Sequence, residues 1–298
     1  MRSKRFLILR LLTLASLMLL ARFAVAGPRQ PLASALTRRD GKSLYVQVKV
    51  NHAGPFWFNV DSGAHHTIID PLVAQQARLR IIGSSTTTGT GQGEVPYQHV
   101  GPITMNVNGL KLDIADPWVI DLSSTGNPEW MHGLLGAQFF EAYVIEIDPE
   151  KPALRFFDAK TYQPPKDAAK IPLIVENDRF FVMAKLEVND RLTVEHKLRV
   201  DTGSEDAVDD EVVKNGMEVR ASILGHGLGQ NYQGQSGVFK AVRLGPFTFQ
   251  QVWGPAITHP AIGMEMFRRF TCIFDAPHRA LYLLPNRHLS EPVPAPGG

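Results

Sequence analysis

The stretch FNVDSGA at residues 58–64 recurs in the second half of the chain as LRVDTGS at residues 198–204. In each copy an apolar run ends at an aspartate, Asp61 or Asp201, and a hydroxyl residue and a glycine follow. Glycine lets the backbone turn sharply directly after the carboxylate. The two copies therefore predict two strand ends that each present an aspartate in the same local geometry.

A second pair of matching segments indicates that the whole chain is duplicated. HGLLGAQFF at residues 132–140 matches HPAIGMEMF at residues 259–267, and VIEID at residues 144–148 matches TCIFD at residues 271–275. These segments follow the aspartate motifs in the same order in both halves. Chance accounts for an isolated D-S-G, but a duplicated domain accounts for ordered blocks.

Each half consists of short alternating stretches separated by Gly, Pro and Asn, which predicts an all-β fold with few short helices. We expect strands at 43–50, 56–60, 101–107, 144–147 and 153–157, and at 180–188, 193–200, 242–249, 272–274 and 280–284. Short helices are expected at 137–142 and 264–269. The predicted organisation is a lobe at 27–160, a linker at 161–170, a second lobe at 171–288 and a disordered tail at 289–298.

The first 26 residues are typical of a secretory signal peptide. Basic residues precede an apolar run at 11–21, and small residues at 24–26 resemble a cleavage site. The apolar run is too short to span a bilayer. We therefore predict an exported protein, periplasmic or secreted, with no membrane span after signal cleavage. Without this segment acidic residues outnumber basic ones, so a nucleic-acid partner is not expected.

The chain has a single cysteine, Cys272. It excludes an internal disulfide and a cysteine-based zinc site. Its alternating surroundings are typical of a buried strand, so a packing role is expected. No metal and no cofactor are predicted.

The paired aspartates suggest general acid–base hydrolysis. If the two halves pack about a pseudo-twofold axis, Asp61 and Asp201 meet there and share one proton. One carboxylate can then take a proton from water while the other donates a proton to a carbonyl oxygen. Gly63 and Gly203 would supply N–H groups to the carboxylates. The hydroxyls of Ser62 and Thr202 can hydrogen-bond across the axis and hold the pair in place.

These motifs resemble the retropepsin-like and pepsin-like aspartic protease superfamily. Its signature is an apolar strand ending in D-[ST]-G-[AS], followed later by two apolar residues and a glycine before a helix, and the likeness covers nearly all of residues 40–285. The resemblance implies two duplicated retropepsin-like β-barrel lobes with pseudo-twofold symmetry and a cleft between them. It implies an aspartic endopeptidase acting on peptide or protein substrates, with neither metal nor cofactor. A duplicated chain would form an intramolecular pseudo-dimer and act as a monomer.

The family also has hairpin flaps that close over substrate. The candidates here are TGTGQG at 88–93, with Gly89 and Gly91, and LGHGLG at 224–229, with Gly225 and Gly227. Dense glycine permits a mobile hairpin and close approach of a peptide backbone. Plain surface loops are the alternative.

The residues after the two motifs differ between the halves. The first half continues with Ala64 and His65, and the second with Ser204, Glu205 and Asp206. In retroviral-type enzymes acidic residues at these positions bind the substrate backbone, which the second half matches and the first does not. The resemblance therefore implies an asymmetric substrate cleft that favours a basic substrate residue beside the acidic pair. Solvated loop residues are the alternative.

Two other functions fit the same motifs. An exported, non-catalytic peptide-binding or assembly module could use the same fold, although both aspartates and both hydroxyl residues are present. A zymogen-like state could also exist, with residues 27–40 covering the cleft.

Overall fold

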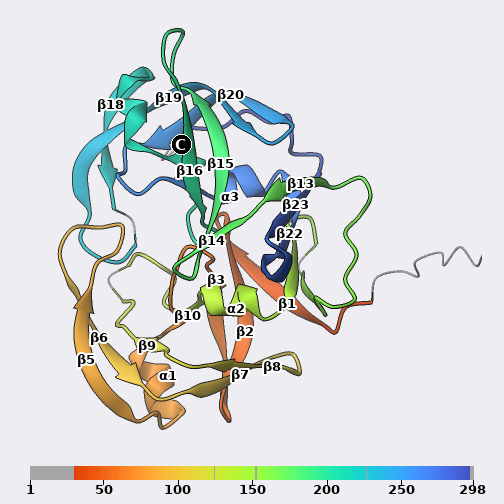
Figure 1. Cartoon of the computed structure of the whole chain (residues 1–298). Helices are drawn as coiled ribbons and strands as arrows, with labels where there is room; N and C mark the ends of the chain where they lie inside the picture. The colour runs from red at the N-terminus through yellow and green to blue at the C-terminus, as the bar shows by residue number, and fades with distance from the viewer. Residues whose placement is uncertain (1–29, 124, 152, 226, 296–298) are drawn as a thin grey trace, which may run out of the picture.

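The computed structural model describes residues 30–123, 125–151, 153–225 and 227–295. These residues form an all-β protein with few short helices, as the sequence predicts (Figure 1). The α-helices are α1 (Pro71–Gln76), α2 (Ala137–Glu141) and α3 (Met264–Phe267). The predicted signal peptide, residues 1–26, lies outside the described residues.

We call the part of the chain from β1 to β12 the N-terminal lobe. Its strands pair in the order β1-β2-β3-β10-β4-β9-β6-β5, and β7 and β8 extend the sheet from β2. The bounds are β1 (Ala33–Asp40), β2 (Ser43–Val50), β3 (Ala53–Val60), β4 (Ile68–Ile69), β5 (Ile81–Thr87), β6 (Val95–Val100), β7 (Ile103–Val107), β8 (Leu110–Ile114), β9 (Trp118–Val119), β10 (Met131–Leu135), β11 (Val144–Asp148) and β12 (Ala153–Phe157).

We call the part from β13 to β23 the C-terminal lobe. One sheet runs in the order β17-β21-β16-β15-β19-β18, with β14 on β15 and β20 on β19. The bounds are β13 (Ala169–Pro172), β14 (Ile174–Glu176), β15 (Arg179–Glu187), β16 (Thr193–Val200), β17 (Val208–Asp209), β18 (Met217–Leu224), β19 (Tyr232–Leu244), β20 (Phe247–Pro255), β21 (Ala261–Ile262), β22 (Phe270–Asp275) and β23 (Ala280–Pro285), with 3₁₀ turns η1 (Glu211–Asn215) and η2 (Ala276–His278).

The same strand arrangement surrounds each aspartate motif. β3 and β16 end just before Asp61 and Asp201, and each pairs in parallel with a short strand of the glycine block, β10 or β21. That short strand pairs antiparallel with the strand after the motif, β4 or β17. The likeness agrees with a duplicated chain, which remains a prediction from the sequence.

A shared sheet joins the two lobes. It runs in the order β13-β23-β22-β11-β12-β1, so strands of the N-terminal lobe continue directly into strands of the C-terminal lobe. At the junction β11 and β22 are antiparallel, with Ile145 opposite Phe274 and Ile147 opposite Cys272. All four side chains are buried. Main-chain hydrogen bonds and apolar packing therefore fix the lobes against each other.

One predicted strand was wrong and one helix was missed. The predicted strand at 242–249 contains a turn between β19 and β20, where Gly245 has a φ of +54°. The apolar residues on both sides of this tight turn conceal it in the sequence pattern. Helix α1 was not predicted, although Asp70 caps it by accepting a hydrogen bond from the N–H of Leu72 and Pro71 opens it. Both are recognised start signals of a helix.

Residues 33–40, which one alternative placed over the cleft, form strand β1. Its first half pairs with β12 and its second half with β2. These residues therefore belong to the sheet that joins the lobes and do not cover a site.

Residues 289–295, predicted to be disordered, pack against the C-terminal lobe instead. Val293 is buried, and the buried guanidinium of Arg269 donates hydrogen bonds to the carbonyl oxygens of His288 (2.9 Å), Glu291 (2.8 Å) and Pro292 (3.2 Å). A buried charge needs such acceptors. The Pro-rich composition of this segment hides that requirement.

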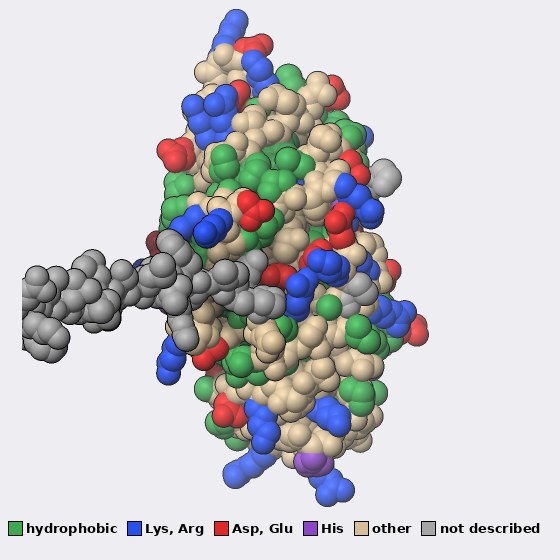
Figure 2. Space-filling view, turned by 90° about the vertical axis from the view of Figure 1, so that its right-hand side faces the viewer, with side chains coloured by type: hydrophobic (Ala, Val, Ile, Leu, Met, Phe, Trp, Pro, Cys, Tyr) green, Lys and Arg blue, Asp and Glu red, His purple; other side chains and the backbone are tan. Residues whose placement is uncertain are grey.

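The outer surface mixes charges of both signs. On the face drawn in Figure 2, Lys, Arg, Asp and Glu side chains are interspersed with hydrophobic ones. Across the part of the chain that the structure describes, none of the helices has the length and apolar character needed to cross a membrane.

Ending the chain after His288 should lower the free energy of unfolding by about 2–4 kcal/mol. The truncation removes two acceptors of a buried guanidinium and exposes the site of Val293. Urea denaturation would measure the change. Glu291→Gln is the control and should stay close to the wild type, since it keeps the backbone acceptor and removes only the partly exposed carboxylate that pairs with Arg268 and His288. Equal stability of the truncated and full chains would contradict the assigned contacts.

Candidate active site

Each aspartate is fixed at the end of a buried strand. Val60 and Val200, the residues before the aspartates, have no exposed surface. The backbone N–H of Asp61 donates to Leu135 O and that of Asp201 to Ile262 O, both at 3.0 Å. The glycine-block strands therefore hold the two aspartates in matching positions.

Backbone amides orient both carboxylates. Oδ1 of Asp61 accepts hydrogen bonds from the N–H groups of Gly63 (2.9 Å) and Ala64 (3.1 Å). Oδ1 of Asp201 accepts from Gly203 (3.0 Å) and Ser204 (3.1 Å). The sharp turn predicted after each aspartate is therefore what brings these donors within reach.

The two carboxylates face each other across the lobes. A Cβ added to Gly63 would lie 2.3 Å from Cγ of Asp201, and one added to Gly203 would lie 2.4 Å from Cγ of Asp61. Any side chain at either glycine would displace the opposite carboxylate. The structure thus brings together Asp61 and Asp201, which the sequence analysis singled out in separate halves of the chain.

Crossed hydrogen bonds of Ser62 and Thr202 hold this arrangement. Thr202 Oγ1 accepts from Ser62 N–H (2.9 Å) and donates to Val60 O (2.7 Å). Ser62 Oγ accepts from Thr202 N–H (3.0 Å) and donates to Val200 O (2.7 Å). Both hydroxyl residues are fully buried. Each turn is therefore bound to the opposite lobe by hydrogen bonds with which water does not compete.

Sequence reasoning missed Arg199, which lies beside one aspartate. Its Nη2 donates to Oδ2 of Asp201 at 2.8 Å. Strand alternation is the signal that could have found it, because residues two apart in a strand share a face. The corresponding residue of the N-terminal lobe is the uncharged Asn59.

The pKa of Asp61 is raised to about 7. Burial raises it most, the nearby Asp201 carboxylate raises it further, and Arg199 and the two backbone N–H groups oppose the shift. For Arg199, burial lowers the pKa, but Asp201, Asp61 and Asp209 outweigh this and raise it overall. Asp61 is therefore protonated below neutral pH, while Arg199 stays charged.

The two glycine-rich segments are the tips of hairpins β5–β6 and β18–β19, and they contact each other (Figure 1). Gly91 N–H donates to Leu228 O at 2.9 Å, and Gln92 and Gln230 exchange two backbone bonds of 2.8 Å. A Cβ on Gly89 would lie 2.4 Å from Leu228 O. Such close approaches explain Gly89 and Gly91 of the first tip.

The glycines of the second tip have a different origin. Gly225 and Gly227 have φ values of +87° and +143°, which side chains rarely adopt, and a Cβ on Gly225 would lie 2.9 Å from Cα of Gly91. The second tip is therefore shaped by backbone conformation as well as by the contact with the first.

Glu205 differs from its predicted role in substrate binding. Its Oε1 accepts from Lys42 N–H (3.0 Å), Ser43 N–H (3.1 Å) and Ser43 Oγ (2.9 Å), and its backbone oxygen accepts from Lys42 Nζ. This carboxylate holds the β1–β2 turn of the other lobe. Because the Glu205 carboxylate is already bound within the protein, it does not support the predicted preference for a basic substrate residue.

His65 makes the corresponding contact from the N-terminal lobe. Its Nε2 lies 3.3 Å from Oδ2 of Asp178, which belongs to the β14–β15 turn. The rings of His65 and His66 lie side by side, 4.4 Å between centroids, because this segment bends.

Ala64, Ser204 and Asp206 complete the predicted set. Ala64 O and Ser204 O accept from the first residues of α2 and α3, Ala137 (2.9 Å) and Met264 (2.8 Å). Asp206 N–H donates to Ser204 Oγ at 3.2 Å. The backbone of the residues after the motifs therefore holds the helices that follow the two glycine blocks.

An aromatic stack links the first hairpin to the turn after Asp61. Trp118 stacks on Tyr97 of β6 and on His66, with ring centroids 3.9 and 3.8 Å apart. Burial lowers the pKa of His66. Sequence reasoning did not group these residues, since Trp118 is distant from both in the chain.

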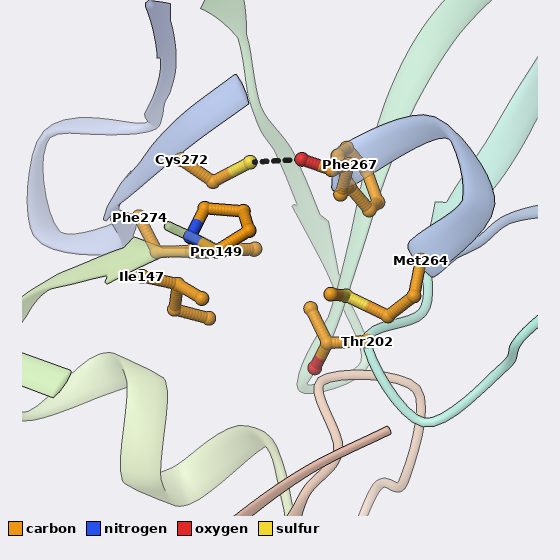
Figure 3. Close-up of a pocket in the computed structure, with 7 residues that line it drawn as sticks. All are labelled: Ile147, Pro149, Thr202, Met264, Phe267, Cys272 and Phe274. Atoms are coloured by element: carbon orange, nitrogen blue, oxygen red, sulfur yellow. Dashed lines mark hydrogen bonds between the residues drawn. The ribbon is translucent and has the colours of Figure 1, made fainter. Parts of the chain in front are cut away.

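The space beneath Thr202 is packed core. Figure 3 shows Thr202 and Met264 at one end of a small gap and Cys272 and Phe267 at the other. The gap has no room for a water molecule. Cys272 is buried, and burial raises the pKa of its thiol, which fits the predicted packing role.

Thr202→Val should destabilise the protein by about 2–4 kcal/mol. The valine leaves Ser62 N–H and Val60 O buried without their partner. Thr202→Ser keeps the hydroxyl, as Ser62 does in the other lobe, and should stay within about 1 kcal/mol of the wild type. Urea denaturation compares the three proteins. A valine variant as stable as the serine variant would contradict the role of the crossed bonds.

Stability should fall as pH rises from about 4 to 7. The folded-state pKa of Asp61 is about 7 against an ordinary 3.8, so the folded state binds this proton more tightly. The stabilisation is present below pH 4 and is lost as pH rises through 7. Unfolding at several pH values measures the slope, which Asp61→Asn should make shallower by up to about one proton. An unchanged slope would refute the raised pKa.

Comparison with known families gives a match for part of the chain. Residues 46–139 match the model of the family described as Aspartyl protease. The match spans β3, the motif from Asp61 to Gly63 and the glycine block at 133–136. A comparison with curated proteins gave no match. The family match and the geometry of its motif support an aspartic protease of the retropepsin-like superfamily.

Proposed function

We propose that the protein is an aspartic endopeptidase whose two catalytic residues, Asp61 and Asp201, come from different lobes. The family match supports aspartic peptidase activity in general. The observation that carries the finer proposal is the crossed bonding of Ser62 and Thr202, which orients both carboxylates toward each other. Both aspartates keep the amide donors that such a pair needs.

The pair would hydrolyse a peptide bond with one shared proton. The ionised carboxylate takes a proton from water, and the water oxygen forms a bond to the carbonyl carbon. The carbonyl oxygen receives the proton of the other carboxyl group. As the C–N bond of the resulting diol breaks, the nitrogen takes up the first proton and one diol hydroxyl returns a proton to the second carboxylate. Both carboxyl groups return to their starting states.

The substrate would be a peptide or protein segment in extended form. The two hairpin tips are joined by backbone hydrogen bonds at Gly91 and Gln230, and separation of the tips would admit this substrate. The chain supplies both aspartates itself, so we expect a monomer that acts as an intramolecular pseudo-dimer. We also propose that residues 1–26 direct export to the periplasm or outside the cell.

Purified residues 27–298 should cleave members of a diverse peptide library between roughly pH 3 and 7, with activity falling as pH rises through about 7. The fall follows from the loss of the Asp61 proton. Asp61→Asn and Asp201→Asn should each lower kcat/KM by at least about 100-fold. Mass spectrometry of the products over roughly pH 3 to 9 measures both effects.

Asp190→Asn is the matched control, because Asp190 is an exposed acid paired with Lys240. It should cleave like the wild type. Full activity of one dyad variant would show that the two-lobe pair is wrong. Absence of cleavage at every pH would favour the non-catalytic binding module.

A further inference from the structure

The surroundings of the two aspartates differ in charge. Arg199 contacts Asp201, whereas the corresponding Asn59 is neutral and buried. We propose that Arg199 is a positioning residue that assigns the roles of the pair: it keeps Asp201 as the carboxylate that activates water and leaves Asp61 to carry the proton. This assignment rests on the proposed peptidase function.

Hydrogen bonding differs between the two carboxyl groups. Both oxygens of Asp201 are engaged, Oδ1 by the amides of Gly203 and Ser204 and Oδ2 by Arg199 Nη2 at 2.8 Å. Asp61 receives its amide bonds at Oδ1. Donors around both oxygens favour the ionised form of a carboxyl group. The geometry therefore favours the negative charge on Asp201.

The guanidinium is held where its charge acts on the pair. The Arg199 side chain is 16% exposed, and its buried Nε has no hydrogen-bond partner among the described residues. Arg199 lies two residues before Asp201 in β16, so both side chains share one face of the strand. Low solvent access weakens screening of the Arg199–Asp201 attraction.

Asp209 is the other acid that faces this guanidinium. It lies in β17, and both Asp209 and Arg199 pair with Ala261 of β21, whose short side chain separates them. Burial first, then Asp206 and Asp201, raise the pKa of Asp209 well above its usual range. Asp209 therefore holds its proton more tightly than an ordinary aspartate, which reduces its competition with Asp201 for the charge of Arg199.

The next charged side chain along this face of β16 is already paired. Lys197 lies two residues earlier on β16 and forms an ion pair with Glu176 of β14. Opposite Arg199, β15 presents the uncharged Phe181. Arg199 is therefore the cation that pairs with Asp201, where the N-terminal lobe has the neutral Asn59.

The assigned roles give a balanced step. Asp201 takes a proton from water as the new C–O bond forms, and Asp61 gives its proton to the carbonyl oxygen as the π bond breaks. When the C–N bond breaks, Asp201 passes its proton to the nitrogen and the diol returns one to Asp61. The raised pKa of Asp61, about 7, keeps it protonated through this range.

The test compares wild type, Arg199→Asn, Arg199→Lys and the control Arg243→Asn, which removes an exposed arginine paired with Glu187. Arg199→Asn gives the second lobe the residue that the first lobe has. It should move the acidic limb of the kcat/KM profile upward by about 1–3 pH units and the alkaline limb less. Arg199→Lys should stay within about half a unit, and the control should not shift.

A second readout does not depend on activity. Carbon-13 labelling of aspartate carboxyl groups, assigned with Asp61→Asn and Asp201→Asn, reports which group is protonated. In the wild type between pH 4 and 7 the proton should reside on Asp61. A proton on Asp201 there would overturn the proposal, even if Arg199→Asn fails to fold.

The two proposals fail in different ways. Cleavage with unshifted limbs in a folded Arg199→Asn variant would overturn the role of Arg199 and leave the peptidase function standing. Absence of cleavage with a displaced carboxyl titration in Arg199→Asn would overturn the peptidase function and support the electrostatic role. A shift of equal size in Arg199→Lys would show that charge is not the determinant.

Discussion

The site depends on the crossed hydrogen bonds between Ser62 and Thr202. Each hydroxyl is a donor and an acceptor at once, so one side chain satisfies a carbonyl and an amide of two chain segments. These bonds set the distance between the two turns, and the turns determine the positions of the two carboxylates. The close packing of Gly63 and Gly203 against the opposite carboxyl groups is possible because the turns cannot shift.

Everything around this centre limits relative motion of the lobes. The strands β11 and β22 continue one sheet from lobe to lobe, and Glu205 holds the β1–β2 turn. The hairpin tips add backbone bonds on another side. The burial that follows raises the pKa of Asp61, so the same packing that gives rigidity also makes the pair useful as an acid and a base.

The sequence predicts the β architecture and the paired aspartates because both are local patterns: alternation for strands, and D-[ST]-G for the turns. It predicts Ser62 and Thr202 because a hydroxyl recurs beside each aspartate. It cannot show that Glu205 is bound by Lys42 and Ser43, since that depends on how distant turns meet. The contacts of Val293 were missed for the same reason, because tertiary context overrides local composition, whereas the turn at 245–246 was missed because apolar residues flank it on both sides.

The contacts of Glu205 and His65 also decide which lobe can partner which. Lys42 and Asp178 each occupy the second position of a two-residue turn, and each turn lies against the loop after the opposite motif. Two N-terminal lobes would set Lys42 against His65, which offers no carboxylate, and two C-terminal lobes would set Asp178 against Glu205, two acids. Only the mixed pair sets the donors of the β1–β2 turn against Glu205 and Asp178 against His65, so the chain discriminates against assemblies of identical lobes.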